Sequence, residues 1–420
     1  MKQEDKIKRL EARNLTKLKR QSQDCKCYTL KIDESRLNRT QREFLKMSFI
    51  ESQWYYNFIL SQENVFDNSV RKVNTVKIKK LDNFEDRELK YISAQMKTGL
   101  HERVCITIKS LSTKKKKGKV KDVGRLKYTK EVNSIELKQF GMTWKFDKTR
   151  IKIQGVKKPF KIEGYNQIPK DCEFANAKLI KKPSGYYIQI TTFQNKIKKK
   201  LTQKSVGLDF GIKDSIVTSD GEKFNIKIRE SKRLKRLQIF FSKKTKGSHK
   251  RYKTLQKIKK EYELISNQKK DKVDKIVSYL KNNYDEVYIQ DEQIANWHKG
   301  LFGKQIQNSA LGAIKSKLKN LESTYVIDKW KPTTKLCPEC GVLNRISLSE
   351  RIYNCSCGYS QDRDVHSANN ILLIGQNLKS GSDMERISTI LEGETSVKLD
   401  FSNIISHNSM KGEAQGFILG

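Results

Sequence analysis

Three short stretches that each carry a carboxylate, far apart in the chain, constrain this sequence more than any other feature. Residues 205–212 read SVGLDFGI, so an apolar run leads to Asp209 and glycines flank it. Residues 287–292 read VYIQDE, and residues 362–372 read DRDVHSANNIL shortly after a group of four cysteines. The first two stretches read as strands and the third as the start of a helix. Side chains of distant segments can converge from such rigid positions.

We expect the fold to bring Asp209, Glu292 and Asp364 together around divalent metal. Metal-assisted hydrolysis of a phosphodiester requires several carboxylates at close range, because they hold two Mg²⁺ ions that activate water and stabilise the leaving oxygen. Any one acid alone is ordinary, since an Asp at a strand end or helix start is usually a turn or cap residue. The order of elements that carries all three acids makes the combination specific.

The charge of the chain points to a polyanionic partner. Its 420 residues include 87 Lys and Arg against 47 Asp and Glu, a formal net charge of +40. Such self-repulsion is relieved when basic side chains bind phosphates and release counterions. Nucleic acid is the first candidate and a membrane surface the alternative. No run of about 18 apolar residues is present, so the sequence predicts no membrane span.

Four of the eight cysteines have the spacing of a zinc ribbon. Cys337 and Cys340 form one pair and Cys355 and Cys357 a second, tighter pair. Two such pairs on facing turns provide four thiolates for tetrahedral Zn²⁺, which leaves no position for water and predicts structural zinc. The charged amino terminus lacks the apolar centre of a signal peptide, which predicts a reducing cytoplasm where clustered cysteines bind metal more often than they form disulfides.

Hydrophobic periodicity divides the chain into modules. A basic arm, either helical or disordered, precedes a strand and an amphipathic helix, and a second helical region is expected from about residue 84 to 111. Alternating segments between residues 134 and 193 predict a β-barrel-like module. The basic stretch 227–282 has a break near residues 246–249 and predicts a helical hairpin.

Taken together, these motifs resemble the TnpB (OrfB) proteins of insertion sequences and, equally, the miniature type V CRISPR effector nucleases. The resemblance spans about residues 27–376 and rests on GLDFGI, the acid-bearing strand, KPTTKLCPECG and DRDVHSANNIL. It implies an α+β multidomain fold: a β-barrel wedge domain with a helical insertion, and an RNase H-like RuvC nuclease domain with an inserted zinc ribbon. It also implies a guide RNA, RNA-guided cleavage of target DNA, and reading of a short motif beside the target.

The resemblance also suggests where the domains begin and end. The expected divisions are a basic arm (1–26), the wedge domain (27–36 and 113–195), a helical recognition insertion (37–112), the first part of the nuclease domain (196–331), the zinc ribbon (332–360), the last part of the nuclease domain (361–376) and a disordered carboxy-terminal tail (377–420). On this division the ribbon interrupts the nuclease domain just before its last acid.

The middle acid departs from the common family pattern. Where the family usually has Glu followed by Asp, this chain has Gln290, Asp291 and then Glu292. In a strand, residues 290 and 292 point to the same face, so Glu292 would reach the metals from one pleat further along, about 6–7 Å away. Asp291 should point to the opposite face. A weakened or inactive nuclease that still binds DNA is the other interpretation.

The resemblance assigns Asp209 and Asp364 as catalytic, metal-binding acids, and we expect Glu292 to complete a site for two Mg²⁺ ions. Arg363 is a candidate for positioning the scissile phosphate or a simple ion pair. Trp297 is a candidate for stacking on a base, with core packing as the alternative.

We therefore expect an RNA-guided DNA endonuclease of the prokaryotic cytoplasm, associated with the nucleoid when bound to DNA, that acts as a monomer or as a homodimer on one guide. Two alternatives stay open: an RNA-guided DNA-binding repressor without cleavage, and a DNA transposase that acts without guide RNA. The sequence does not separate a transposon-encoded protein from a CRISPR-associated one.

Overall fold

The computed structural model describes residues 3–80, 83–118, 121–122, 124, 126–196, 201–226, 228, 231–300, 302–347 and 349–380. The chain forms two compact units, Met1–Lys199 and Lys200–Gly420. Most of the tail predicted to be disordered, residues 381–420, lies outside the described residues. Within these ranges, no helix combines the length and the apolar character needed to cross a membrane.

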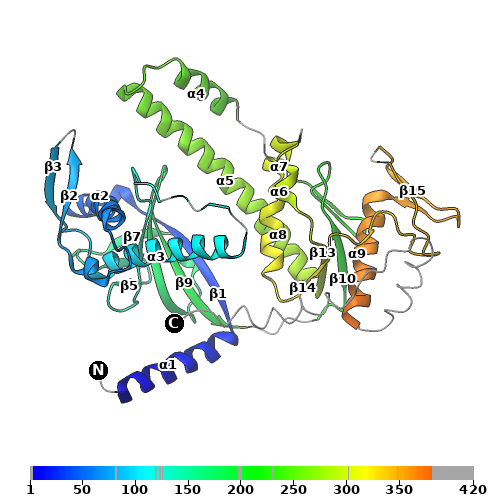
Figure 1. The fold of residues 1–420 in the computed structure, drawn as a ribbon, viewed down its shortest axis with the longest axis horizontal. Coiled ribbons are helices and arrows are strands. Elements are labelled where there is room, and N and C mark those ends of the chain that lie inside the picture. Colours follow the sequence, from blue (N-terminus) through cyan, green and yellow to red (C-terminus); the bar gives the residue numbers. More distant parts are fainter. Residues whose placement is uncertain are drawn as a thin grey trace. The chain divides into compact units, whose positions relative to one another are not determined.

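A curled antiparallel sheet organises the first unit (Figure 1). Its seven described strands have the order β4-β8-β9-β1-β7-β6-β5. Alternate residues such as Ile188 and Ile190 are buried inside it, because successive side chains of a strand point to opposite faces. The nearly closed, barrel-like sheet confirms the module expected from the alternating pattern. The strands are β1 (Gln23–Ile32), β4 (Ser134–Leu137), β5 (Trp144–Asp147), β6 (Arg150–Ile153), β7 (Phe160–Glu163), β8 (Glu173–Lys182) and β9 (Gly185–Asn195).

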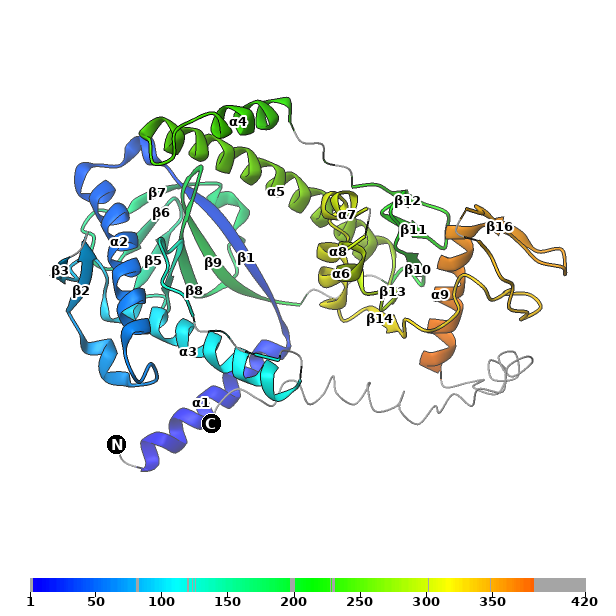
Figure 2. The same cartoon turned by 45° about the horizontal axis from the view of Figure 1, so that its top comes forward.

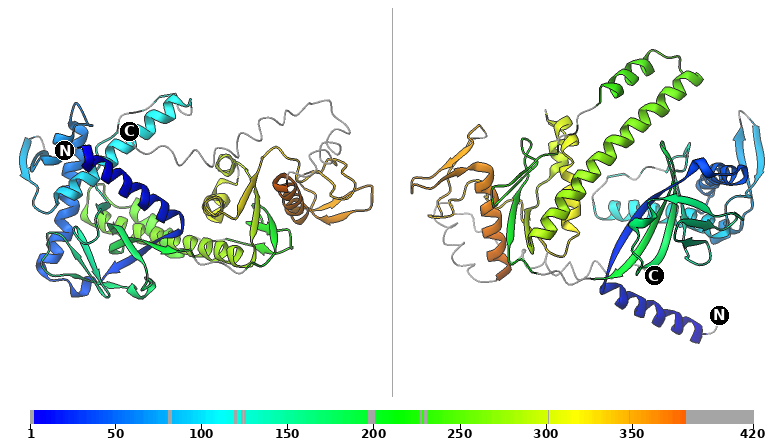
Figure 3. Two further views of the ribbon diagram at one scale, coloured as in Figure 1. Left: turned by 90° about the horizontal axis from the view of Figure 1, so that it is seen from below. Right: turned by 180° about the vertical axis from the view of Figure 1, so that it is seen from behind.

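Helices and a hairpin complete the first unit, and the view from behind in Figure 3 shows α1 next to the start of β1. The expected helix from residue 84 is wrong at its start, because residues 83–88 pair with residues 75–80 as a β-hairpin. The helix begins at Ala94, where the Ser93 side chain accepts a hydrogen bond from the Met96 N–H and caps it. The elements are α1 (Gln3–Gln21), η1 (Glu34–Arg36), α2 (Arg39–Ser61), η2 (Asn68–Lys72), β2 (Thr75–Lys80), β3 (Asn83–Glu88), α3 (Ala94–Lys116) and η3 (Tyr165–Gln167).

A mixed sheet with the strand order β12-β11-β10-β13-β14 forms the centre of the second unit. Within this unit β10, β11 and β12 pair antiparallel, β13 pairs parallel with β10, and β14 pairs parallel with β13. This is the RNase H-like arrangement that was expected. The strands are β10 (Ser205–Asp209), β11 (Ile216–Thr218), β12 (Lys223–Phe224), β13 (Glu286–Gln290) and β14 (Thr324–Ile327).

Helices cover both faces of this sheet (Figure 2). Val206 and Leu208 of β10 pack into a core with residues of α5 and α8, on one face. Tyr288 of β13 packs with residues of α9, on the other. The expected helical hairpin is present as α4 and α5. The helices are α4 (Lys232–Ser242), α5 (His249–Asn283), α6 (Ile294–Trp297), α7 (Gly303–Ser309), α8 (Leu311–Lys319) and α9 (Arg363–Ser380).

Two glycines let α9 lie close against the sheet. A Cβ atom at Gly207 of β10 would collide with the backbone carbonyl of Ala368 in α9. A Cβ atom at Gly375 of α9 would collide with the ring of Tyr288. Before α9, the chain forms the cysteine-bearing segment and the short hairpin of β15 (Ile352–Asn354) and β16 (Ser360–Asp362).

Candidate active site and metal centres

The first acid stands at the end of the central strand, facing α9. Residues of β10 alternate between the two faces of the sheet, so Asp209 follows Gly207 onto the face that α9 covers. There the Ser367 hydroxyl donates a hydrogen bond to Asp209 Oδ1 over 3.0 Å. Asp209 is therefore held by a contact from the helix that carries Asp364.

The third acid lies in the first turn of α9. The Asp362 carboxylate accepts hydrogen bonds from the backbone N–H groups of Asp364 (3.0 Å) and Val365 (3.3 Å) and so caps the helix. Asp362 is therefore the residue that caps the helix, and the Asp364 side chain lines the cavity instead. This division of roles leaves the Asp364 carboxylate available to the site.

Glu292 reaches the site by a different route from the one expected. Strand β13 ends at Gln290, and the Glu292 N–H donates to the Gln290 carbonyl over 2.9 Å in a tight turn. The parity of an extended strand therefore does not apply to residue 292. The Lys315 ammonium donates to the Glu292 carbonyl and holds this turn. Asp291 pairs instead with Lys315 at 2.9 Å and with Lys319 at 2.6 Å.

The three acids line a single cavity of about 1110 Å³ in the second unit. Arg363 lines it as well, donating to Asp364 Oδ1 over 3.3 Å and to the Glu350 carbonyl over 3.0 Å. Sequence reasoning missed three further basic residues of the lining, which come from separate segments: Lys213, Lys235 and Arg351. A cavity that combines carboxylates with such cations suits a metal-bound phosphate group.

Three ionised carboxylates without a bound cation are electrostatically unfavourable in this cavity. Burial raises the pKa of Asp209 well above its ordinary value, and the nearby carboxylates of Glu292 and Asp364 raise it further, while the Ser367 hydrogen bond opposes the rise. Burial also raises the pKa of Glu292 to about 7, against the influence of the Lys315 ammonium. Both shifts indicate negative charge that lacks sufficient compensation.

The donor set fits Mg²⁺. Glu292 Oε2 is buried without a hydrogen-bond partner among the described residues. A cation would both occupy this oxygen and relieve the repulsion at Asp209, and Mg²⁺ prefers carboxylate oxygens. Asp209, Glu292 and Asp364 could therefore hold the metal.

Gln290 is buried and does not line this cavity. Its side-chain amide donates to the backbone carbonyls of Asp328 (3.2 Å), Lys329 (3.2 Å) and Lys331 (2.9 Å). The residue that stands where the family usually has an acid thus binds main-chain oxygens.

Trp297, the candidate for base stacking, is half-buried at the end of α6. It packs against the apolar core shared by β10, β13 and α8, and it is absent from the cavity lining. This packing favours the structural alternative for Trp297, whereas Arg363 keeps its place beside the acids.

Ser367 is a site residue that sequence reasoning missed. Its signal is spacing: it follows Asp364 by three positions on a helix, which places both side chains on the same face. A serine within a helix is common, however, and the sequence does not indicate that a strand residue 158 positions away accepts its proton.

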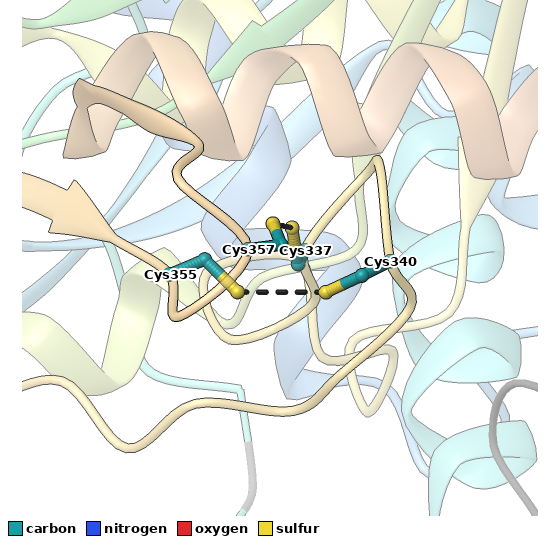
Figure 4. A group of neighbouring side chains, drawn as sticks. All are labelled: Cys337, Cys340, Cys355 and Cys357. Atoms are coloured by element: carbon teal, nitrogen blue, oxygen red, sulfur yellow. Dashed lines mark hydrogen bonds between the residues drawn. The ribbon is translucent and has the colours of Figure 1, made fainter.

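The four predicted zinc ligands lie together (Figure 4). Their sulfur atoms all lie within 4.8 Å of one another. Cys337 Sγ is 3.6 Å from Cys357 Sγ, and Cys340 Sγ is 3.5 Å from Cys355 Sγ. Four converging thiols are the donor set of a closed, tetrahedral Zn²⁺ site, and they fit structural zinc.

Two family models match successive parts of the chain. OrfB_IS605, described as a probable transposase, matches residues 188–299, and the Cas12f1-like TNB domain matches residues 312–371. The cryo-EM structure of a Cas12f1–sgRNA–target DNA complex aligns with 83% of this chain and 99% of that chain at 14% identity. Its TM-score of 0.24 is too low to establish a shared fold.

Three curated relatives have informative names. A Streptomyces pristinaespiralis protein named as an RNA-guided DNA endonuclease is 28% identical over 253 residues, 58% of this chain and 62% of that protein. The Escherichia coli (strain K12) protein InsQ, also named as an RNA-guided DNA endonuclease, is 27% identical over 45% of this chain and 53% of its own length. TnpB-like protein L79 of Acanthamoeba polyphaga mimivirus is 26% identical over 41% of this chain and 38% of its own length.

The match thus spans less than two thirds of each of these relatives. The two family models nevertheless cover the segments that carry the acids and the cysteines. The resemblance seen in the motifs is confirmed: over these segments the chain is similar to the OrfB_IS605 family and to the Cas12f1-like TNB domain.

Proposed function

We propose that this protein is an RNA-guided DNA endonuclease that cuts by divalent-metal-dependent hydrolysis. The observation that carries the proposal is the convergence of Asp209, Glu292 and Asp364 on one cavity, where a buried carboxylate oxygen lacks a partner. The guide RNA and the DNA substrate are proposed by analogy with two relatives, which are named as RNA-guided DNA endonucleases. The cytoplasm of a prokaryotic cell is the expected location.

Each residue has a distinct task in this proposal. Asp209, Glu292 and Asp364 hold Mg²⁺, which when bound activates water and stabilises the departing oxygen. Arg363 restrains the Asp364 carboxylate and presents its guanidinium to a phosphate group in the same cavity. The lining cations Lys213, Lys235 and Arg351 attract the phosphate backbone to the acids.

Sequence specificity would come from base pairing between the guide and the target, while the protein contacts backbone and a short flanking motif. The net charge of +40 suits a protein that holds both nucleic acids. The four-cysteine segment would fold around structural Zn²⁺ immediately before the helix that supplies Asp364.

The test uses the full chain purified with co-expressed RNA. Matched duplex DNA and Mg²⁺ are added, and cleavage by wild type is compared with Asp209→Ala. The variant should bind guide and target but leave the DNA intact. Equal cutting by Asp209→Ala would refute the assignment of this site.

The departure at Gln290 motivates a second candidate, an RNA-guided DNA-binding repressor without cleavage. The presence of Glu292 in the cavity favours the nuclease, because the third carboxylate comes from two residues further along the chain. Guide-dependent binding without Mg²⁺-dependent cutting would select the repressor. Absence of co-purifying RNA would instead select a transposase that works without a guide.

A further inference from the structure

A buried polar cluster connects the three segments that carry the acids. It consists of Gln290, Thr333, Ser367 and Asn370, which lie at the end of β13, in the loop before the cysteines, and on α9. Each is at most 5% exposed. None lines the cavity, so any effect on the acids must act through the groups that they hold.

Gln290 fixes the loop that follows β14. The two protons of its amide are shared among three backbone carbonyls of residues 328–331, the shortest at 2.9 Å. Its Oε1 atom accepts a hydrogen bond from the Thr333 hydroxyl over 3.0 Å. The loop is therefore tied to the strand immediately before the turn that carries Glu292.

Asn370 ties the same loop to α9. Its amide donates to the carbonyls of Thr333 (2.7 Å) and Leu336 (2.8 Å). One turn earlier on α9, Ser367 donates to Asp209. The loop thus links the segment before Glu292 to the helix that holds Asp364 and contacts Asp209.

The hydroxyl protons have a definite arrangement. Ser367 Oγ lies 3.0 Å from Asp209 Oδ1 and 3.4 Å from Thr333 Oγ1, and it has one proton to give. The contact to the Asp209 oxygen is the shorter of the two and is therefore the stronger hydrogen bond. Thr333 gives its own proton to Gln290, so the two hydroxyl oxygens simply touch.

We propose that Gln290, Thr333 and Ser367 are positioning residues that hold the carboxylates of Asp209 and Glu292 ready to bind divalent metal. The inference rests on the proposed metal-dependent function. It also gives the glutamine at position 290 a task that an acid could not perform. An ionised glutamate there would place negative charge against three carbonyl oxygens and would donate no hydrogen bond to them.

Mn²⁺ binding tests the inference without relying on cleavage. The full chain, cleared of divalent ions with its cysteine-bound zinc retained, is titrated with Mn²⁺, and free Mn²⁺ is measured by electron paramagnetic resonance. Asp209→Ala identifies binding at the acids. Ser367→Ala should weaken that binding about 10–100-fold, the usual cost of removing a residue that orients a metal ligand.

Two matched pairs separate positioning from general damage. Thr333→Val, which removes the hydroxyl at constant volume, should weaken Mn²⁺ binding, and Thr333→Ser should restore it. Ser360→Ala removes a serine hydroxyl that donates to Asn354 instead, and it should bind Mn²⁺ like wild type. Gln290→Glu, although closer to the family pattern, should weaken binding rather than improve it.

Melting temperatures without divalent ions show which variants fold, and DNA cleavage is assayed in parallel. The inference is overturned if folded Ser367→Ala and Thr333→Val bind Mn²⁺ as tightly as wild type, or if wild type has no Asp209-dependent Mn²⁺ site. If the variants lose Mn²⁺ affinity and wild type binds Mn²⁺ without cutting DNA, the positioning inference stands and the proposed nuclease function fails.

Discussion

The second unit contains two ligand clusters that differ in how they are assembled. The thiols of Cys337, Cys340, Cys355 and Cys357 come from one segment and lie within 4.8 Å of one another. The carboxylates of Asp209, Glu292 and Asp364 come from two strand ends and a helix start, and they line a large cavity. The first cluster is complete in itself, whereas the second leaves room for a substrate.

The two clusters should therefore affect the stability of the protein in opposite ways. Thiolates that enclose a metal link the ends of their own loops, so metal binding contributes directly to folding. Carboxylates that converge without a cation repel one another and cost stability, a common feature of active sites. Substitutions in one cluster should therefore destabilise the protein, while substitutions in the other should abolish activity and leave stability unchanged or higher.

The largest effect is expected at the thiols. Cys337→Ser combined with Cys340→Ser should remove zinc and unfold the surrounding segment, since structural zinc contributes about 10–16 kcal/mol in small zinc-binding domains. Zinc per chain, measured by elemental analysis, should fall from one to none, and the thermal transition of the second unit should broaden or vanish. Cys25→Ser with Cys27→Ser, exposed thiols of β1, is the matched control and should change neither.

Glu292→Gln should separate activity from stability. Cleavage of matched duplex should fall at least about 10³-fold, as for other residues that act as one catalytic unit. Without divalent ions the melting temperature should rise, by roughly 2–4 °C for each kcal/mol of relieved repulsion. Asp271→Ala, which removes a carboxylate from an exposed pair with Lys275 on α5, should preserve cleavage. A drop in melting temperature for Glu292→Gln would contradict the contrast between the clusters.

A smaller effect on the melting temperature is expected when the pH of the metal-free protein is changed. Folding raises the pKa of Glu292 from an ordinary 4.5 to about 7, so its contribution to stability is complete below about 4.5 and is lost as the pH rises through 7. Wild type should therefore lose melting temperature more steeply than Glu292→Gln across this interval. Saturating Mg²⁺ should reduce the difference, because the cation favours the ionised carboxylate. If the melting temperatures of wild type and Glu292→Gln fell equally with pH in the absence of metal, the pKa of Glu292 would not be raised as proposed.

The smallest effect is expected at the ion pair outside both clusters. Lys223 Nζ lies 3.0 Å from Asp362 Oδ2, and both side chains are more than 40% exposed. Lys223→Ala should change the free energy of unfolding by at most about 1 kcal/mol, as for other exposed pairs. Denaturant unfolding measures this value. A larger loss would mean that the start of α9 depends on this pair as well as on its backbone cap.

Local patterns predicted much of the fold. Alternation between residues 134 and 193 predicted the barrel-like sheet, and the break at residues 246–249 located the helical hairpin. Residues 84–88 were assigned to a helix, because the mostly polar sequence of this segment carries no clear period. Pairing with residues 75–80, which the sequence does not reveal, decides the structure there.

Some residues of the candidate site could likewise be predicted from the sequence, and others could not. Asp209 and Asp364 were indicated by local motifs, and the cysteines by their spacing. Glu292 was chosen by strand parity, yet a turn after Gln290 places it. Lys235, Arg351 and Ser367 escaped notice because their relation to the acids depends on long-range packing.

The two glycines between α9 and the sheet have a mechanical consequence. They allow the backbone of α9 to approach the backbone of β10 at Gly207. The spacing between the helix and the sheet therefore controls the distance between Asp209 and Asp364. Mg²⁺ accepts ligands within a narrow range near 2.0–2.1 Å, so a shift of one methyl group would exceed its tolerance. The dimensions of the proposed metal site would thus depend on Gly207, a residue that has no side chain and takes no part in the proposed chemistry.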